Sequence, residues 1–316
     1  MLSRVADSCF WLSRYLERAE SMARIIDVNI QLGLDTQDGP ESADRLWRPI
    51  LETLADTSSF FSLHKAVEGD AVMDFTTFDR RNPNSIVSCV AYARENARTV
   101  REQISSEMWE QLNGVHLFLQ GTAAREAHQS SPIGFFRSLV DRLHSFQGIT
   151  DATMTHGEGW DFLQAGKYLE RADATSRVLD FKYHVLLPSG EQVGGHVDTV
   201  QWMAVLRSCS AMEAYLKLFH GRVTSWNVAD FLILHDRFPR SIRFCADALD
   251  ASLHRISGTP RGQFQNEAER LGGLLTSTLD YTTISSIFEA GLHEYLDETQ
   301  SRIAALSNAL AETYCR

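Results

Sequence analysis

Apolar side chains recur at intervals of three and four residues along most of the chain. In residues 10–31 they fall on one broad arc when successive residues are placed 100° apart, as on an amphipathic helix. Residues 85–105 and 200–219 show the same spacing. Residues 72–78 alternate briefly, as a short strand does, although the matching residues 228–234 are typical of a helix or loop. The pattern therefore predicts an all-α protein. Loops are expected where Gly, Pro, Ser and Asp gather, at 33–44, 128–134, 148–160, 187–198 and 257–264.

The helical pattern is duplicated within the chain. Tyr15-Leu-Glu-Arg-Ala-Glu20 returns as Tyr168-Leu-Glu-Arg-Ala-Asp173, a shift of 153 residues. Later matches at shifts of 155 and 156 include Trp47/Trp202, His64/His220, Asp74-Phe75/Asp230-Phe231, Arg81/Arg237, Pro83/Pro239, Ser85-Ile86/Ser241-Ile242 and Cys89/Cys245. We therefore expect a helical bundle of two tandem repeats, 1–150 and 151–316, related by a pseudo-twofold axis and packed as one globular unit.

Composition and charge exclude several classes of function. The formal net charge is −11, and nucleic-acid binding would require a clustered surface of Lys and Arg, so neither nucleic acid nor an anionic membrane is an expected partner. No apolar run approaches the roughly 20 residues that span a bilayer, and the N-terminus lacks the apolar stretch of a signal peptide. The five scattered cysteines are typical of reduced thiols. A cytoplasmic location is therefore expected.

A charged stripe lies opposite the apolar arc of residues 10–31 and recurs in the second copy. It comprises Arg14, Glu17, Glu20, Arg24, Asp27 and Gln31 in the first copy and Lys167, Glu170, Asp173, Arg177, Asp180 and His184 in the second. Arg18 and Arg171 lie at the edge of this face and are candidates to anchor to the other half. Three interpretations stay open: a solvated face with helix ion pairs, a structural network joining the halves, or a polar cleft at the pseudo-twofold axis. In such a cleft, arginines would bind a carboxylate or phosphate, while glutamates would accept an ammonium group or act as acid and base.

The remaining candidate chemistry favours no cofactor. His293 lies in Glu289-x3-His293-x3-Asp297, one helical stripe, but the paired Glu-x-x-His helices of a di-iron bundle and the HExxH motif are both missing, so no metal is predicted. His64 and His220 each follow an apolar run, and are interpreted as core or capping histidines. Phosphate-binding glycine loops and the nucleophile elbow are also missing from the sequence.

These residues resemble the bacterial alpha-E domain family. The resemblance rests on the opening Leu2-Ser-Arg-Val-Ala6, on Trp11-Leu-x-Arg14 followed by Tyr15-Leu-Glu-Arg-Ala-Glu20, on Asn82-Pro83-Asn-Ser85-Ile86, on Ala93-Arg-Glu-Asn-Ala-Arg98, on Ser106-Glu-Met-Trp-Glu110, on Tyr168-Leu-Glu-Arg-Ala-Asp173 and on Phe238-Pro-Arg-Ser241. It runs from the first residues to about residue 300. The one departure is Cys9-Phe10, where the resemblance leads us to expect a Tyr next to Trp11.

The resemblance implies which proteins act together with this one, but not which reaction they carry out. Family members tend to be encoded beside ATP-grasp amidoligase-like proteins and transglutaminase-like peptidases, which suggests a role in making, modifying or trimming a peptide or amino-acid conjugate. The leading hypothesis is an accessory protein that binds an amino acid or peptide and acts with an ATP-grasp amidoligase. Its predicted ligand-binding residues are Glu17, Arg18, Arg24, Asp27, Glu170, Arg171, Arg177 and Asp180. The alternatives are an enzyme acting on an amide or peptide through Glu17 or Glu170 as acid-base, and a purely structural adaptor. Whether the chain is an enzyme therefore stays open.

Overall fold

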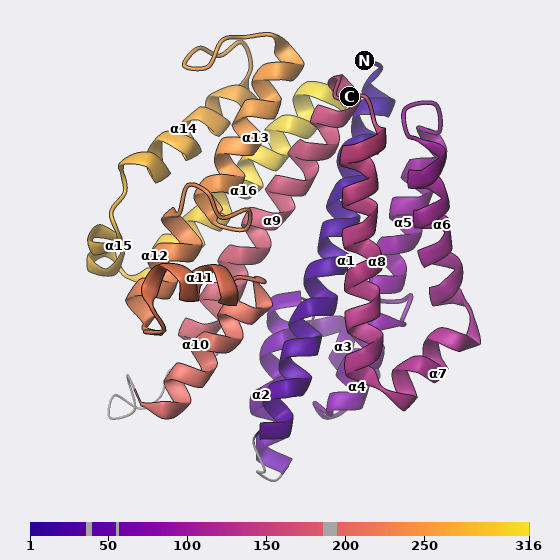
Figure 1. The fold of residues 1–316 in the computed structure, drawn as a ribbon, viewed down its shortest axis with the longest axis vertical. Coiled ribbons are helices and arrows are strands. Elements are labelled where there is room, and N and C mark those ends of the chain that lie inside the picture. Colours follow the sequence, from indigo (N-terminus) through magenta and orange to yellow (C-terminus); the bar gives the residue numbers. More distant parts are fainter. Residues whose placement is uncertain (36–39, 55–56, 186–194, 316) are drawn as a thin grey trace. The chain divides into compact units, whose positions relative to one another are not determined.

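The computed structural model describes residues 1–35, 40–54, 57–185 and 195–315, and within these ranges the chain forms helices and turns without a strand (Figure 1). The all-α prediction is confirmed. In chain order the helices are α1 (Ser3–Asp35), α2 (Pro40–Leu54), α3 (Thr57–Leu63), α4 (Gly69–Thr77), α5 (Ile86–Thr99), α6 (Ser106–Gln120), α7 (Thr122–Ser130), α8 (Pro132–Thr153), α9 (Glu158–Val185), α10 (His196–Ser208), α11 (Met212–Phe219), α12 (Ser225–Leu234), α13 (Ile242–Ser257), α14 (Glu267–Tyr281), α15 (Ile284–Ala290) and α16 (Leu292–Tyr314).

The chain divides into two compact units. Residues 11–155 form one, here called the N-terminal unit; residues 1–10 join residues 156–316 in the other, the C-terminal unit. The helices α1–α8 and α9–α16 follow the same order of lengths: one long, one of medium length, two short, two of medium length, one short and one long. The repeat seen in the sequence thus extends to the secondary structure. The pseudo-twofold axis and the shared core stay predictions.

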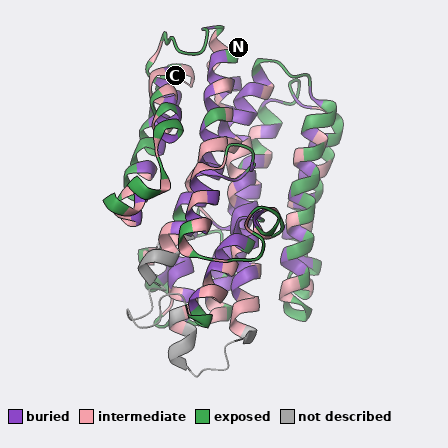
Figure 2. Cartoon of the chain, turned by 60° about the vertical axis from the view of Figure 1, so that its left-hand side comes forward, coloured by how far each residue is buried: buried purple, intermediate pink, exposed green. Residues whose placement is uncertain are grey.

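Each unit is built around its longest helices. In the N-terminal unit α8 packs on α6 and α7, and α5 packs on α6; in the C-terminal unit α9 packs against α13 and α16, and α14 packs on both of these. Phe136 and Leu139 of α8 and Leu253 and Leu296 of α13 and α16 are completely buried. The helices present a buried face and an exposed face, as amphipathic periodicity requires (Figure 2).

The structure resolves one ambiguous pattern and contradicts one local prediction. Residues 72–78 lie largely in α4, not in a strand, because Val72, Phe75 and Thr76 follow one another at helical spacing and are all buried. The helix expected over 200–219 is interrupted: α10 ends at Ser208 and α11 begins at Met212. Ser210 between them has a φ of 49°, a left-handed conformation that no continuous helix contains.

No helix within the described ranges combines the length and the low charge that a bilayer-spanning segment needs.

Candidate functional site

The carboxylates of the charged stripe lie inside the N-terminal unit. Glu17 is 1% exposed and Glu20 is 0% exposed, where α1 meets α8. The Gln147 side chain donates a hydrogen bond to Glu17 Oε2 at 2.8 Å. His144 Nε2 lies 2.9 Å from Glu20 Oε1. The prediction of a solvated face is therefore wrong for these residues: they occupy a helix–helix contact, which periodicity alone did not distinguish from the surface.

The same contact continues toward the end of α1. Arg24, itself buried, forms an ion pair with Glu20 one turn away. Asp27 Oδ2 lies 3.6 Å from Nε of Arg137 on α8, while Asp27 Oδ1 is buried and makes no hydrogen bond. Burial raises the pKa of Asp27, and the nearby Arg137 guanidinium opposes that rise. Glu17, Glu20, Arg24 and Asp27 thus lie along one contact between α1 and α8, and these residues with their partners on α8 are called here the α1–α8 ladder.

The ladder's partners on α8 were not predicted. Arg137, His144 and Gln147 are separated by seven and three residues, the same intervals that separate Asp27, Glu20 and Glu17 in reverse order. Two antiparallel helices bring such positions together along one seam. That shared spacing is the signal in the sequence that identifies these partners.

In the C-terminal unit the corresponding stripe is partly accessible. Glu170 and Arg171 are buried, but Arg177 pairs with Asp173 at 2.7 Å with its side chain 45% exposed. His293 Nδ1 of α16 lies 2.7 Å from Asp180 Oδ1, and this hydrogen bond raises the pKa of His293. The His293 stripe considered for a metal is thus engaged with Asp180, and the described residues contain no group of three or more ligands fit for a metal ion.

Arg18 and Arg171 have the same role in their respective units. Arg18 Nη1 donates to Asn84 Oδ1 at 2.9 Å, and Arg171 Nη1 donates to the Pro239 carbonyl at 3.3 Å. Both contacts fix the turn that precedes the matched helices α5 and α13. Each guanidinium also lies over the tyrosine three residues earlier, 5.9 Å from the Tyr15 ring centroid and 5.6 Å from that of Tyr168. Each arginine of the stripe's edge therefore holds a turn of its own unit.

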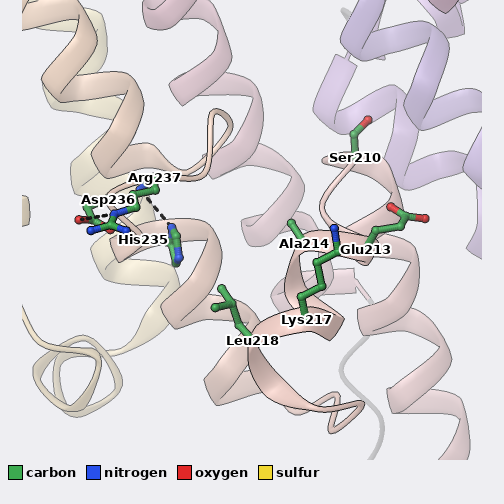
Figure 3. Close-up of a pocket in the computed structure, with 8 residues that line it drawn as sticks. All are labelled: Ser210, Glu213, Ala214, Lys217, Leu218, His235, Asp236 and Arg237. Carbon is green, nitrogen blue, oxygen red and sulfur yellow. Dashed lines mark hydrogen bonds and ion pairs between the residues drawn. The ribbon is translucent and has the colours of Figure 1, made fainter.

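The structure also contains a hollow that sequence analysis missed. It lies in the C-terminal unit between α11 and the turn joining α12 to α13, with a volume of about 600 Å³ (Figure 3). Its lining residues are Ser210, Glu213, Ala214, Lys217, Leu218, His235, Asp236 and Arg237. Glu213 and Lys217 are exposed, and they form no hydrogen bond or ion pair with other described residues. Its signal in the sequence is the charge of Glu213 and Lys217, because the matching positions of the first copy are the uncharged Thr57 and Phe61.

Comparison with known proteins agrees with the architecture. A family model named Alpha-E, described as a predicted alpha-helical domain with a conserved ER motif, matches residues 1–315. The chain belongs to the Alpha-E family. It carries the Glu-Arg pair in α1, at Glu17-Arg18, and again in α9, at Glu170-Arg171. The family assignment made from the sequence is thereby confirmed.

The chain is also similar to part of three longer proteins. Three curated matches, from Mycobacterium bovis and two strains of Mycobacterium tuberculosis, bear the name uncharacterized protein. Each is 25% identical over an alignment of 279 positions, and the match covers 81% of this chain. The chain spans 30% of the length of these relatives. No solved structure matches it.

Proposed function

We propose that this Alpha-E chain is a helical accessory protein that binds an amino acid or peptide and acts with an ATP-grasp amidoligase in peptide synthesis or modification. The observation that supports a non-catalytic role is the burial of the α1–α8 ladder. Glu17 is 1% exposed and accepts a hydrogen bond from Gln147. A general base has to reach the proton that it removes, and a carboxylate held inside a helix pair does not reach a substrate unless the pair opens.

The ladder instead forms a rigid frame. Buried carboxylates are costly unless they are paired, and Glu20 is paired with both Arg24 and His144. Arg18 and Arg171 then fix the turns before α5 and α13. In the N-terminal unit the ladder and Arg18 thus hold the helices of that unit, and in the C-terminal unit Arg171 fixes the turn before α13, the turn whose residues 235–237 line the hollow.

The partnership is tested by co-purification with the ATP-grasp amidoligase-like protein expected to be encoded beside this chain. A transglutaminase-like protein encoded nearby is the second candidate partner. The expected result is a stable complex with the amidoligase that retains an amino acid or peptide detectable by mass spectrometry. Failure of the two purified proteins to associate would contradict the partnership.

The variant Glu17→Gln separates the accessory role from the enzyme alternative. In a frame, removing the charge that Gln147 contacts should lower the free energy of unfolding by roughly 1–3 kcal/mol, while complex formation by the folded protein persists. The exposed residue Glu126 provides the matched control Glu126→Gln, expected to change stability by less than about 0.5 kcal/mol.

The enzyme alternative predicts a different pattern. If Glu17 or Glu170 acted as acid-base, the chain alone would turn over an amide or peptide substrate, and Glu17→Gln or Glu170→Gln would abolish turnover at an unchanged melting temperature. The same two variants test whether the predicted ligand-binding residues of the stripe contact a ligand, because ligand retention would then fall without a change in stability.

A further inference from the structure

The hollow of the C-terminal unit differs in chemistry from the same place in the N-terminal unit. The turn that contributes to it, at Asp236 and Arg237, matches the turn of the N-terminal unit at Arg80 and Arg81 at the shift of 156 residues. Both turns lead into a serine-capped helix, α5 after Ser85 and α13 after Ser241. Two turns at matched places in the chain thus carry different side chains, and these differences indicate what each copy can bind.

In the N-terminal unit the turn neutralises its own arginine. Asp79 Oδ1 accepts hydrogen bonds from the backbone N–H and from Nε of Arg81, both at 2.9 Å, and Asp79 Oδ2 lies 2.6 Å from Arg81 Nη2. The Arg81 guanidinium therefore holds the pKa of Asp79 below its usual value. Asp79 and Arg81 thus neutralise each other, while Arg80, the counterpart of Asp236, donates a hydrogen bond to the Gln120 side chain.

In the C-terminal unit a histidine replaces that aspartate. His235 Nδ1 accepts from the backbone N–H groups of Arg237 and Phe238, at 3.1 and 3.0 Å, so it caps the turn as Asp79 does. A nitrogen that accepts two N–H groups carries no proton, and the ring proton of the neutral imidazole then lies on Nε2, where it can be donated. Arg237 instead forms a long ion pair with Asp236, with 3.8 Å between Arg237 Nε and Asp236 Oδ2. The side chains of Arg237 and Asp236 are 86% and 62% exposed.

The helix opposite this turn shows the same contrast. Glu213 and Lys217 lie one helical turn apart on α11, and Figure 3 shows them across the hollow from His235. The matching positions of the N-terminal unit are Thr57 and Phe61, and the Phe61 ring lies under the Arg48 guanidinium at 5.6 Å. The charged pair on α11 therefore has no counterpart in the N-terminal unit.

We propose that the hollow binds an amino acid or short peptide through both of its charged termini. Lys217 recognises the carboxylate, Glu213 recognises the ammonium group, the Nε2–H of His235 is a further donor on the opposite side of the hollow, and Leu218, 50% exposed, contacts the aliphatic part. Lys217 and Arg237 are balanced by Glu213 and Asp236, which favours a zwitterion over a phosphate dianion, because the carboxylates repel a dianion. The ligand class rests on the proposed function; the position and the need for two opposite charges rest on the hollow itself.

Titration of the purified full chain tests this proposal without any partner protein. The probes are L-alanyl-L-alanine, its N-acetyl form and its C-terminal amide, followed by isothermal calorimetry or by ligand-observed NMR. The free dipeptide is expected to bind, and each capped form, which lacks one charge, is expected to bind roughly three- to tenfold more weakly.

Matched variants assign each charge. Lys217→Met should remove the preference for the free carboxylate over the amide, and Glu213→Gln should remove the preference for the free ammonium group over the acetylated form. Both side chains are exposed, so both variants should fold, which circular dichroism checks. The controls Lys65→Met and Glu126→Gln change exposed residues outside the hollow and should leave both preferences intact.

The outcomes separate this proposal from the proposed function. If L-alanyl-L-alanine does not bind, or if Lys217→Met and Glu213→Gln bind the three probes as the unmodified chain does, the hollow is not the site. That failure would leave an amidoligase complex unaffected. Conversely, dipeptide binding with the expected preferences supports the hollow even if no amidoligase associates.

Discussion

Arg18 and Arg171 occupy matched positions, and each has a structural role in its own unit. Each donates to the turn before the matched helix, to Asn84 Oδ1 in one unit and to the Pro239 carbonyl in the other. In both turns a cysteine thiol makes a further contact, Cys89 with the Asn84 carbonyl at 3.4 Å and Cys245 with that of Pro239 at 3.5 Å. Cys89 lies in α5 and Cys245 in α13, and both act as small buried residues that contact the preceding turn, as their positions on apolar faces predict.

Replacing Arg18 by Lys should destabilise the N-terminal unit although the charge is kept. A lysine ammonium group lacks the planar fork that reaches Asn84 while lying over Tyr15, so we expect a loss of about 1–2 kcal/mol in the free energy of unfolding. Chemical denaturation measures this loss. The control Arg98→Lys changes a 68% exposed partner of Glu95 and should cost less than about 0.5 kcal/mol. Equal effects of the two variants would contradict the role assigned to Arg18.

Two histidines should give the units opposite responses to pH. His128 is enclosed by Phe78, Phe135 and Phe136, and burial lowers its pKa from 6.5. The unfolded chain then binds the proton more readily, so stability is complete above about pH 6.5 and falls as the pH drops below it. The pKa of His293 is raised by Asp180, so its contribution is present below about pH 6.5 and lost as the pH rises.

Melting temperatures between pH 5 and pH 8 measure both effects. His128→Met should flatten the loss of stability on the acidic side, and His293→Asn should flatten the loss on the alkaline side. Unchanged pH profiles in both variants would show that neither histidine titrates as its surroundings imply.

At the scale of elements, the sequence predicted helices well and their interruptions poorly. The long helix around residues 10–31 was predicted because its apolar arc repeats over many turns. The break between α10 and α11 was missed because Ser210 adopts a left-handed conformation in a segment whose apolar spacing continues on both sides. The spacing of apolar residues does not indicate where the backbone of a single residue leaves the helical conformation.

The candidate site was predicted in part for the same kind of reason. The stripe was found because Glu17 and Glu170 recur at matched positions, but its burial depends on α8, far along the chain. His235 was not predicted because the candidate residues were chosen at positions where the two copies match, and at this position they differ. The sequence shows that His235 stands where the first copy has Asp79. That both side chains accept backbone N–H groups of the turn is known only from the structure.

The corner between α15 and α16 offers a test of backbone geometry. Gly291 has a φ of 100°, and a Cβ there would collide with the Glu294 carboxylate. Gly291→Ala should therefore cost at least about 1 kcal/mol in the free energy of unfolding. In contrast, a Cβ at Gly114, inside α6, would meet no atom within 4 Å, and Gly114→Ala should stabilise by about 0.5–1 kcal/mol. Thermal unfolding of the two variants should thus shift in opposite directions.

For the whole molecule, the open question is how far the two compact units act as one. Leu139 of α8 and Leu296 of α16 are both completely buried, one in each unit. Replacing either by Ala should cost roughly 2–5 kcal/mol, through lost burial and the cavity left behind. Amide hydrogen exchange shows which residues lose protection in each variant, because residues that unfold together share one opening free energy.

If the units unfold independently, Leu139→Ala should lower amide protection within residues 11–155 and leave α9, α13 and α16 as protected as before, and Leu296→Ala should do the reverse. A loss spread evenly over both units in either variant would instead reveal one cooperative core, as two repeats packed about a pseudo-twofold axis require. The second result would place the α1–α8 ladder and the stripe of α9 in a single folding unit. The first would make each copy a separate frame, with the hollow's charges supported by the C-terminal unit alone.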